Sequence, residues 1–311
     1  MKILKILYTV IAVMLFCGLQ VRAEQPGFEL EAVSAIGSGA VAYELSAGNI
    51  FGSIKSRLEF PLDGVYAGVE GVYNSGVNIG GVENISFGVR LLTNLTDPDD
   101  DMNDFDWWNG ALVGDTDSEA EAKSFSMDLF IRTDVVYRPD FILSGIAGFR
   151  YEDYQFDIYG LDGYYLPPLG DGSHVSVDYG IKVLTYDMTH NLFYGGLEGR
   201  VIMTDSITAV GKMTLGIGWA DDRDDHILRS KISKGEYVTL SADVSGYLIW
   251  YLSPADAAAG FYLKAGVEAY GMAGSGEQDQ VFEDGSASFY GIDVDLDLAF
   301  VSGRAMLGCT F

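Results

Sequence analysis

The sequence is poor in cysteine, histidine, proline and positive charge. Its 311 residues include 2 cysteines, 3 histidines and 7 prolines, and 19 Lys and Arg residues stand against 45 Asp and Glu residues. Cys17 lies in an apolar N-terminal run that we expect to be removed, which leaves Cys309 alone. The remaining chain can form no internal disulfide, so its stability must have another source.

The N-terminal segment has the features of a secretory signal peptide. Two lysines form a charged beginning, residues 6–19 are almost wholly apolar, and small residues precede a cleavage point after Ala23. The apolar run is short for a membrane-spanning helix, although a retained anchor is the alternative interpretation. We therefore expect a signal peptide at residues 1–23 and a single domain at residues 24–311.

Loss of the three bases in that segment leaves 16 basic and 45 acidic side chains, a formal charge of −29. This sign excludes nucleic acid as a partner, because phosphate binding needs a basic surface. It disfavours anionic surfaces and steers cationic partners toward the protein. The 17 Phe, 19 Tyr and 39 Gly residues argue for strands and tight turns.

Long apolar runs are also missing after residue 19. No segment there has 18 consecutive apolar residues, which excludes helical membrane spans. Instead, apolar residues alternate with small or polar ones in residues 85–91, 125–137 and 261–270. Strands of this kind have one apolar and one mixed face. A water-soluble sandwich would show the same alternation, so the turns and the chain end must separate the two folds.

The layout of the turns favours a membrane barrel. Tight turns are expected at residues 138–140, 204–206 and 253–256. The intervening connections are long and rich in Asp, Glu and Gly, at residues 97–122, 161–174, 221–235 and 274–287. Short turns at one end and long loops at the other are typical of up-and-down membrane barrels. The last segment ends on Phe311, as the final strand of bacterial outer-membrane barrels does.

We therefore predict an all-β fold, a ten-stranded antiparallel up-and-down transmembrane β-barrel with an extended extracellular rim. Asp63-Gly64 is interpreted as a bulge within the second strand, although a hairpin turn there would add a strand. The expected location is the outer membrane of a Gram-negative-type bacterium. The predicted strands are 28–46, 52–73, 84–96, 123–138, 141–160, 175–201, 203–220, 236–252, 260–273 and 288–311.

An acidic stretch and a later acid–histidine segment share the lumen-facing parity of their strands. Even-numbered residues of the third strand point inward, and if that register continues, Asp104 and Asp106 also point inward. On the strand that starts near residue 207, the same argument turns Asp222, Asp224 and His226 inward. Two carboxylates on one rim strand can then face a carboxylate–imidazole pair on another.

These two segments resemble the signatures of the omptin family of outer-membrane endopeptidases. MNDFDWW (102–108) resembles its Asp-x-Asp-Trp motif, and GWADDRDDH (218–226) resembles its second motif, in which an acid–acid–histidine triplet follows a Gly-Trp pair. NISFGVR, AGFRYEDYQF and the Phe-terminated last strand fall where omptin segments would. The resemblance covers about residues 28–311 and implies a ten-stranded barrel whose extracellular rim holds the site.

The resemblance also implies catalytic roles. Asp104 and Asp106 form one couple, and Asp224 with His226 forms the other, with a water held between them as the nucleophile. His226 acts as the general base, oriented by Asp224. Asp222 matches the acid that lines the first specificity pocket of the family, which implies cleavage next to Arg or Lys. No cofactor and no metal are implied.

Some residues depart from the family pattern. The middle acid of the triplet is Asp225, which points outward. Where related barrels bind lipopolysaccharide phosphates through basic residues, this chain has Asp153 and a segment at 186–190 without Lys or Arg. Binding to outer-membrane lipid is expected, but dependence on lipopolysaccharide is not. Glu44 is the nearest acid to a second specificity position, and it is left out of the predicted site.

Other interpretations stay open at this point. The Asp99-x-Asp101-x-Asn103 spacing resembles a calcium loop without its glycine. His174 and His190 have no evident acidic partner, and His174 is expected to be exposed. The alternative function is a non-catalytic barrel of omptin shape, acting as a porin-like, adhesive or structural surface protein.

Overall fold

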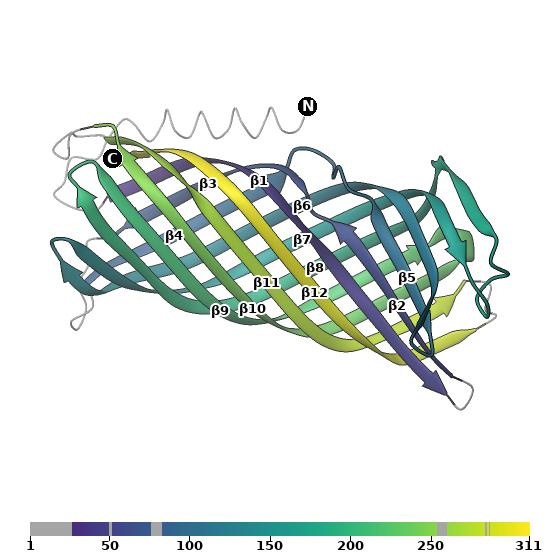
Figure 1. Cartoon of the computed structure of the whole chain (residues 1–311). Coiled ribbons are helices and arrows are strands. Elements are labelled where there is room, and N and C mark those ends of the chain that lie inside the picture. Colours follow the sequence, from purple (N-terminus) through teal and green to yellow (C-terminus); the bar gives the residue numbers. More distant parts are fainter. Residues whose placement is uncertain (1–26, 50–51, 76–82, 254–259, 284, 286) are drawn as a thin grey trace.

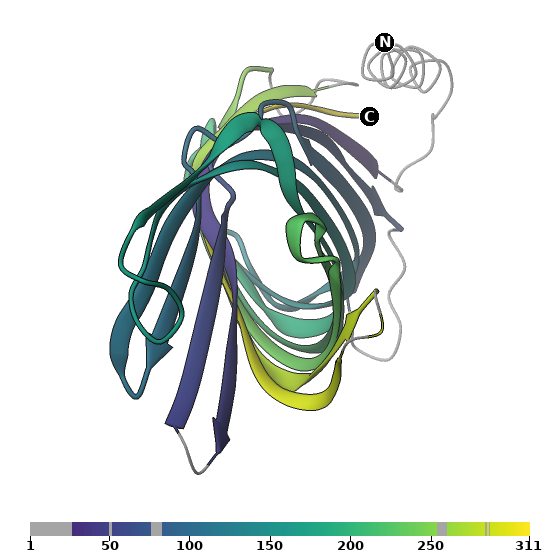
Figure 2. The same cartoon turned by 90° about the vertical axis from the view of Figure 1, so that its right-hand side faces the viewer.

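The computed structural model describes residues 27–49, 52–75, 83–253, 260–283, 285 and 287–311. They form one antiparallel sheet that closes on itself because its first and last strands pair (Figures 1 and 2). The predicted signal peptide at residues 1–23 lies outside the described residues. In the part of the chain that is described, no helix is long and apolar enough to cross a membrane.

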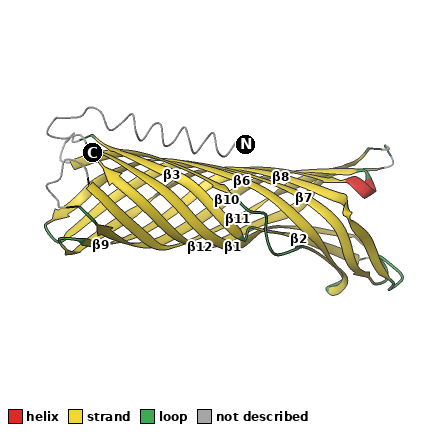
Figure 3. Ribbon diagram, turned by 90° about the horizontal axis from the view of Figure 1, so that it is seen from above, coloured by secondary structure: helices red, strands yellow, loops and turns green. Residues whose placement is uncertain are grey.

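The sheet contains twelve strands, and a short 3₁₀-helix, η1, follows the ninth at the end of the barrel opposite the C-terminus (Figure 3). The elements are β1 (Gly27–Asn49), β2 (Gly52–Pro61), β3 (Gly64–Asn74), β4 (Glu83–Asn94), β5 (Met102–Trp108), β6 (Ala111–Arg138), β7 (Phe141–Tyr165), β8 (His174–Thr204), β9 (Ile207–His226), η1 (Ile227–Arg229), β10 (Lys231–Tyr251), β11 (Gly260–Phe282) and β12 (Ser288–Thr310).

The twelve strands make a ring of ten, as predicted. β2 and β3 both pair with β1 in one register, with Pro61 opposite Ala40 and Gly64 opposite Gly37, so they are halves of one barrel strand. The interruption at residues 62–63 is a local irregularity and not a hairpin turn. β4 and β5 are likewise two halves of a strand, because both pair with β6 on either side of residues 95–101.

The strands are longer than predicted, and much of what we expected to be loop is strand. β6 begins at Ala111 instead of residue 123, β9 ends at His226 instead of residue 220, and β10 begins at Lys231 instead of residue 236. Asp and Gly are depleted in strands, so their abundance predicts loops. Here continuous cross-strand pairing outweighs that weak local preference.

Outward-facing side chains show where the membrane lies. On β9 the outward residues are apolar or small from Ile207 to Trp219, and on β10 from Val238 to Trp250. Trp219 lies opposite Val238 and Ile207 opposite Trp250, so the two apolar bands are level. About twelve residue steps of ~3.3 Å, inclined at ~45°, span ~28 Å, close to the ~30 Å hydrocarbon core of a bilayer.

The barrel continues beyond this band at one end as a polar rim. After Trp219 the outward residues of β9 are Asp221, Arg223 and Asp225. The described chain ends lie at the opposite end of the barrel, where Phe28 and Phe311 exchange two backbone hydrogen bonds (Figure 1). The extended rim that the sequence predicts is therefore present.

The lumen at the level of the membrane is filled by a network of buried ion pairs. Arg90 lies 3.1 Å from Asp128 and 3.3 Å from Glu268, and Arg150 lies 3.4 Å from Asp128 and 3.1 Å from Asp243. All five side chains are at most one tenth exposed. Since burying a charge without a partner is strongly unfavourable, each member of this network holds its neighbours in place.

An aromatic layer separates the ion pairs from the rim. Tyr43, Phe60, Phe156 and Tyr186 are almost completely buried, and the rings of Phe60 and Tyr186 stack with their centroids 4.2 Å apart. Because interiors pack to the density of organic crystals, such a layer fills the narrow lumen. It forms the floor on which the residues of the rim stand.

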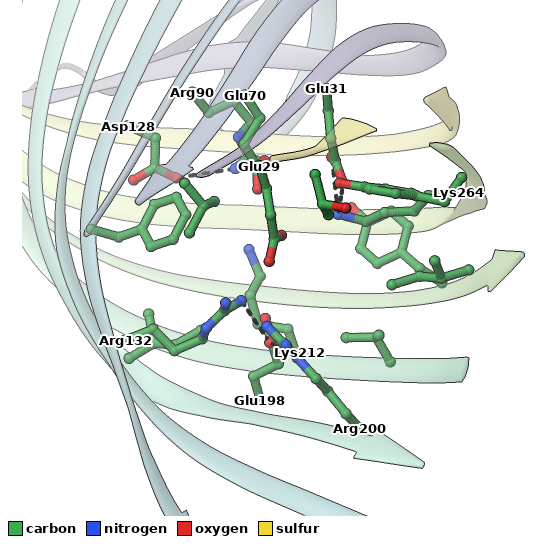
Figure 4. Close-up of a pocket in the computed structure, with 18 of the residues that line it drawn as sticks. Glu29, Glu31, Glu70, Arg90, Asp128, Arg132, Glu198, Arg200, Lys212 and Lys264 are labelled. Atoms are coloured by element: carbon green, nitrogen blue, oxygen red, sulfur yellow. Dashed lines mark hydrogen bonds and ion pairs between the residues drawn. The ribbon is translucent and has the colours of Figure 1, made fainter. Parts of the chain in front are cut away.

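A cavity of about 100 Å³ opens at the end of the barrel where the described chain begins and ends (Figure 4). Its charged side chains are largely paired with one another. Lys264 lies 3.2 Å from Glu31, while Glu198 accepts contacts from Arg132 at 3.1 Å and Arg200 at 2.8 Å. The Lys and Arg side chains named here are thus each in contact with a carboxylate.

Removal of Glu268 tests the contribution of the lumenal network. The Glu268 carboxylate lies 2.6 Å from Arg304 and is one of the two acids that contact Arg90. Glu268→Ala therefore leaves Arg304 buried without this partner and leaves Arg90 with one acid. We expect the free energy of unfolding to fall by about 3–5 kcal/mol, as it does when one partner of a buried pair is lost. Guanidinium unfolding in detergent micelles measures it. Glu277→Ala, an exposed change on the same strand, should stay within about 0.5 kcal/mol of wild type. A loss of less than 1 kcal/mol for Glu268→Ala would contradict a structural role for the network.

Candidate functional site

The structure places all five predicted site residues on the inner face of the rim. On β5, Asp104 shares the inward parity of the buried residues Met102 and Asp106. Across the interruption at residues 95–101 the register against β6 shifts by two residues, from Thr93 opposite Phe125 to Met102 opposite Ser118, so the inward parity is kept. On β9, Asp222 and Asp224 are buried and His226 has the same parity.

One member of each couple lines the same cavity. Asp104 and His226 both line a space of about 60 Å³, together with Thr116, Ser118 and Tyr165. A cavity of that size has room for water, which needs roughly 10–15 Å³ of this measure and a few polar partners. Asp104 lines this space, and its buried Oδ1 atom has no hydrogen-bond partner among the described residues.

The acid–histidine pair is held from three strands. The Nε2 atom of His226 lies 3.0 Å from Oδ1 and 3.1 Å from Oδ2 of Asp224. Tyr43 of β1 reaches across the lumen and donates its hydroxyl hydrogen bond to Oδ2 of Asp224. Burial alone would raise the pKa of Asp224, but the neighbouring His226 and Lys231 and the Tyr43 hydroxyl bring it below its ordinary value. Asp224 therefore stays ionised and can orient the imidazole.

In the Asp104–Asp106 couple, the pKa of Asp104 lies near neutral pH. Burial and the adjacent Asp106 raise the pKa of Asp104 to about 7, although Arg229 and Lys231 act in the other direction. Two carboxylates on one inward row cannot both ionise cheaply, so the pair retains a proton close to neutral pH. A protonated carboxyl donates one hydrogen bond and an ionised one accepts, so this couple can do both.

Asp222 faces the lumen as predicted, but its carboxylate is already well bonded. Oδ1 accepts a hydrogen bond of 2.8 Å from the Gly235 amide, and Oδ2 accepts 2.6 Å and 3.1 Å bonds from the hydroxyls of Tyr237 and Tyr186. Burial raises its pKa to about 6, with the tyrosine hydrogen bonds lowering it. A cationic ligand would have to share this carboxylate with the two tyrosines.

Sequence reasoning missed several partners. Tyr43 lies 181 residues from Asp224, and no local pattern relates them. His190, for which no partner was expected, is fully buried between Glu152 and Thr239, with 2.9 Å from each ring nitrogen to its partner. His174 is exposed, as predicted, but it too has an acidic partner, because its Nε2 atom lies 3.2 Å from Oδ1 of Asp162.

Two hydrogen bonds fix the acidic segment that precedes β5. The Asp97 carboxylate accepts the Ala122 amide at 3.2 Å, and Asp63 accepts the Asp99 amide at 2.7 Å. Among the described residues no group of three His, Cys, Asp or Glu side chains could hold a metal ion. Glu44, left out of the predicted site, contacts Lys55 at 2.7 Å.

The raised pKa of Asp104 predicts a pH-dependent stability difference. Its pKa in the folded chain, about 7, exceeds the ordinary value of 3.8, so its contribution is largest below about pH 4 and is lost as the pH rises through 7. Asp104→Asn removes the ionisation while keeping the shape. At pH 8 this variant should be more stable than wild type by about 1–3 kcal/mol, and the gap should close near pH 4. Denaturant unfolding at both pH values measures it. Asp99→Asn, on the exposed stretch, should show no such difference; parallel pH curves for wild type and Asp104→Asn would rule out the buried proton.

Comparison with known proteins identifies the family. The crystal structure of the outer membrane protease OmpT from Escherichia coli matches with a TM-score of 0.72 and 15% identity, covering 94% of this chain and 99% of that one. The translocator domain of the autotransporter NalP from Neisseria meningitidis matches at 0.34, with 15% identity over 97% of this chain and 96% of that chain. No curated protein matches the sequence. The model of the Omptin family matches residues 69–264, well over half of the chain. The chain therefore belongs to the omptin family of outer-membrane proteases.

Proposed function

We propose that the protein is an outer-membrane endopeptidase that cleaves peptides or proteins with a water activated between the Asp224–His226 pair and the Asp104–Asp106 couple. One observation carries the proposal. Asp104 and His226, from strands far apart in the sequence, line one cavity with room for water, and each stands beside its partner acid. A structural role alone does not require an acid with an unpaired buried oxygen and an imidazole to line the same space.

The proposed reaction follows from these positions. His226 takes a proton from the water as its oxygen attacks the scissile carbonyl carbon, and Asp224 stabilises the imidazolium that forms. The imidazolium then gives that proton to the leaving amine, and the C–N bond breaks. Asp104 and Asp106 hold the water and the carbonyl with their shared proton. General acid–base help of this kind supplies roughly 10²–10⁴-fold, so positioning and exclusion of solvent supply the rest.

Cationic substrates suit the charge of this barrel. With 45 acids against 19 bases in the whole chain, the field around the rim attracts cations. Asp222, one inward position below Asp224, is the acid proposed to receive an Arg or Lys side chain next to the cut. Because Tyr186 and Tyr237 already donate to it, the added cation must approach alongside them.

The membrane contacts proposed for the rim differ from those of a phosphate-binding barrel. Outward-facing Asp153 and Asp187 lie just above the apolar band, and burial together with Asp153 and Asp157 raises the pKa of Asp187. Such a surface disfavours lipid phosphates, so we propose that activity does not depend on lipopolysaccharide. The rim, at the end opposite the chain termini, is proposed to face the exterior.

A peptide assay tests the proposed protease. The barrel refolded in detergent should cleave Arg-Arg and Lys-Lys peptides both with and without lipopolysaccharide. Asp104→Ala and His226→Ala should each lower kcat/KM by at least about 10²-fold, because each removes a group that handles a proton or the water. His174→Ala, at an exposed site, should leave the rate unchanged. If no peptide is cut under any lipid condition, the non-catalytic barrel is the better description.

The role proposed for Asp222 has its own test. Asp222→Asn keeps the shape but removes the charge, so it should raise KM for peptides with Arg or Lys before the cut by about 10-fold or more. For peptides with a neutral residue before the cut, KM should be the same for the variant and the wild type. Asp221→Asn, on the outer face of the same strand, is the matched control. Equal losses for basic and neutral peptides would show that Asp222 supports the tyrosines and does not select the substrate.

A further inference from the structure

Lys231 is a buried cation without an ion pair. The buried basic residues in the described part of the chain are Arg90, Arg132, Arg150, Lys231 and Arg304. The four arginines each lie within 3.3 Å of at least one carboxylate oxygen. Lys231 is only 9% exposed, yet the ion pairs of up to 4 Å among the described residues, from Lys55–Glu44 to Arg304–Glu268, do not include it. In so acidic a chain, a largely buried lysine without an ion pair needs an explanation.

The register of β10 places Lys231 beside the candidate site. It is the first residue of β10 and lies directly opposite His226 of β9. Odd-numbered residues of β10, including the fully buried Ser233, point inward, so the Lys231 and His226 side chains share one face. Side chains directly opposite on antiparallel strands have Cβ atoms about 4.5–5.5 Å apart. Lys231 is therefore the immediate cross-strand neighbour of the proposed base.

The charged groups around Lys231 are those of the site. Burial lowers the pKa of its ammonium, Asp224 raises it, Arg229 lowers it, and Asp104 and Asp106 raise it. These groups come from β5, β9 and η1, so the ammonium stands among both couples without contacting either. Because the Lys231 ammonium forms no ion pair, it can bind an anionic group of a ligand without first breaking one.

The proposed hydrolysis leaves one requirement unmet. Attack of water on a carbonyl creates an oxyanion, and preorganised hydrogen-bond donors for it are often the largest catalytic term. In many proteases backbone N–H groups serve this role, but here the site stands on strands whose N–H groups are paired along the barrel wall. Side chains are then the donors available on these strands, and the shared proton of Asp104 supplies one.

We propose that Lys231 is a further catalytic residue that donates a hydrogen bond from its ammonium to the oxyanion. This inference rests on the proposed protease function. As the water oxygen bonds to the carbonyl carbon and His226 takes the proton, the C=O electron pair moves onto the carbonyl oxygen next to Lys231. When the C–N bond breaks, that pair reforms the C=O bond and His226 protonates the amine. Lys231 keeps all its protons throughout.

Arg229 is the competing candidate. It lines the same cavity as Asp104 and His226, but its side chain is exposed at the mouth, and its guanidinium lies 3.5 Å from the Tyr165 hydroxyl. A donor at the mouth fits contact with the substrate as it enters. Lys231 is buried and directly opposite the base, which fits contact with the reacting carbonyl.

Substitution of Lys231 by an uncharged side chain of similar length tests the proposal. Lys231→Met should lower kcat on a cleaved peptide by about 10²–10³-fold, the loss typical of one oxyanion donor, with KM changed less than 3-fold. Lys234→Met is the matched control, because it removes the same charge from the outward face of the same strand and should keep wild-type rates. Arg229→Met should change KM more than kcat.

Chemical restoration separates a catalytic ammonium from a structural one. Lys231→Cys, alkylated with 2-bromoethylamine, regains an ammonium at lysine length, whereas alkylation with iodoethane gives a neutral chain. Activity should return with the first reagent only. Wild type treated in parallel controls for reaction at Cys309, which is buried. Equal rescue by both reagents, or less than a 3-fold loss of kcat in Lys231→Met, would overturn the assignment.

A binding measurement covers the case in which no peptide is cleaved. A phosphinic peptide with basic flanking residues carries a tetrahedral anion, and calorimetry should show at least 10-fold weaker binding to Lys231→Met than to wild type. If wild type binds it in this way but cuts nothing, Lys231 is supported as an oxyanion ligand and the protease proposal fails. Equal binding by both proteins overturns the role of Lys231. No binding and no cleavage by wild type overturns both proposals.

Discussion

Pairing of β1 with β12 is the constraint on which the rest of the structure depends. The register runs from Glu29 opposite Thr310 to Ser46 opposite Asp293 and leaves the ring without an open edge. In a closed sheet with a side-chain period of two, every residue is committed to lipid or to lumen, and a slip of one residue would exchange the two faces. Closure also brings Tyr43, on the first strand, across to Asp224 on the ninth.

The lumen handles charge differently along its length. At the level of the membrane, arginines and acids are matched in contact pairs, as between Arg150 and Asp243, and the result is a rigid filling. Above the aromatic layer, charges are close but not matched. Asp104 keeps a proton near neutrality, and Lys231 forms no ion pair among the described residues. Incomplete pairing is costly to stability, and its concentration in the rim is the reason for proposing the active site there.

The acidic stretch at residues 97–108 is ordered because its second half, β5, pairs with β2 and β6 in the rim. DPDDDMNDFDWW (97–108) is both a local connection and one wall of the candidate site. Its first acid, Asp97, accepts a hydrogen bond from the Ala122 amide of β6, beside the interruption between β4 and β5. Its last acids, Asp104 and Asp106, continue the inward row of the barrel strand. Figure 1 shows β5 standing within the wall of the extended end.

The sequence by itself determined the alternation, the number of barrel strands, the inward parity of Asp104, Asp106, Asp222, Asp224 and His226, and the family. Those are properties of period-two patterning and of short motifs, which are local. It underestimated strand length, because Asp and Gly weigh against strands until cross-strand partners are known. Only the tertiary structure decided that Tyr43 donates a hydrogen bond to Asp224 and that two tyrosine hydroxyls donate to Asp222. It also decided that Lys231 lies opposite His226 without an ion pair. Each of these relations joins residues of different strands, and the closure and register of the barrel, to which all ten strands contribute, set the distance between them.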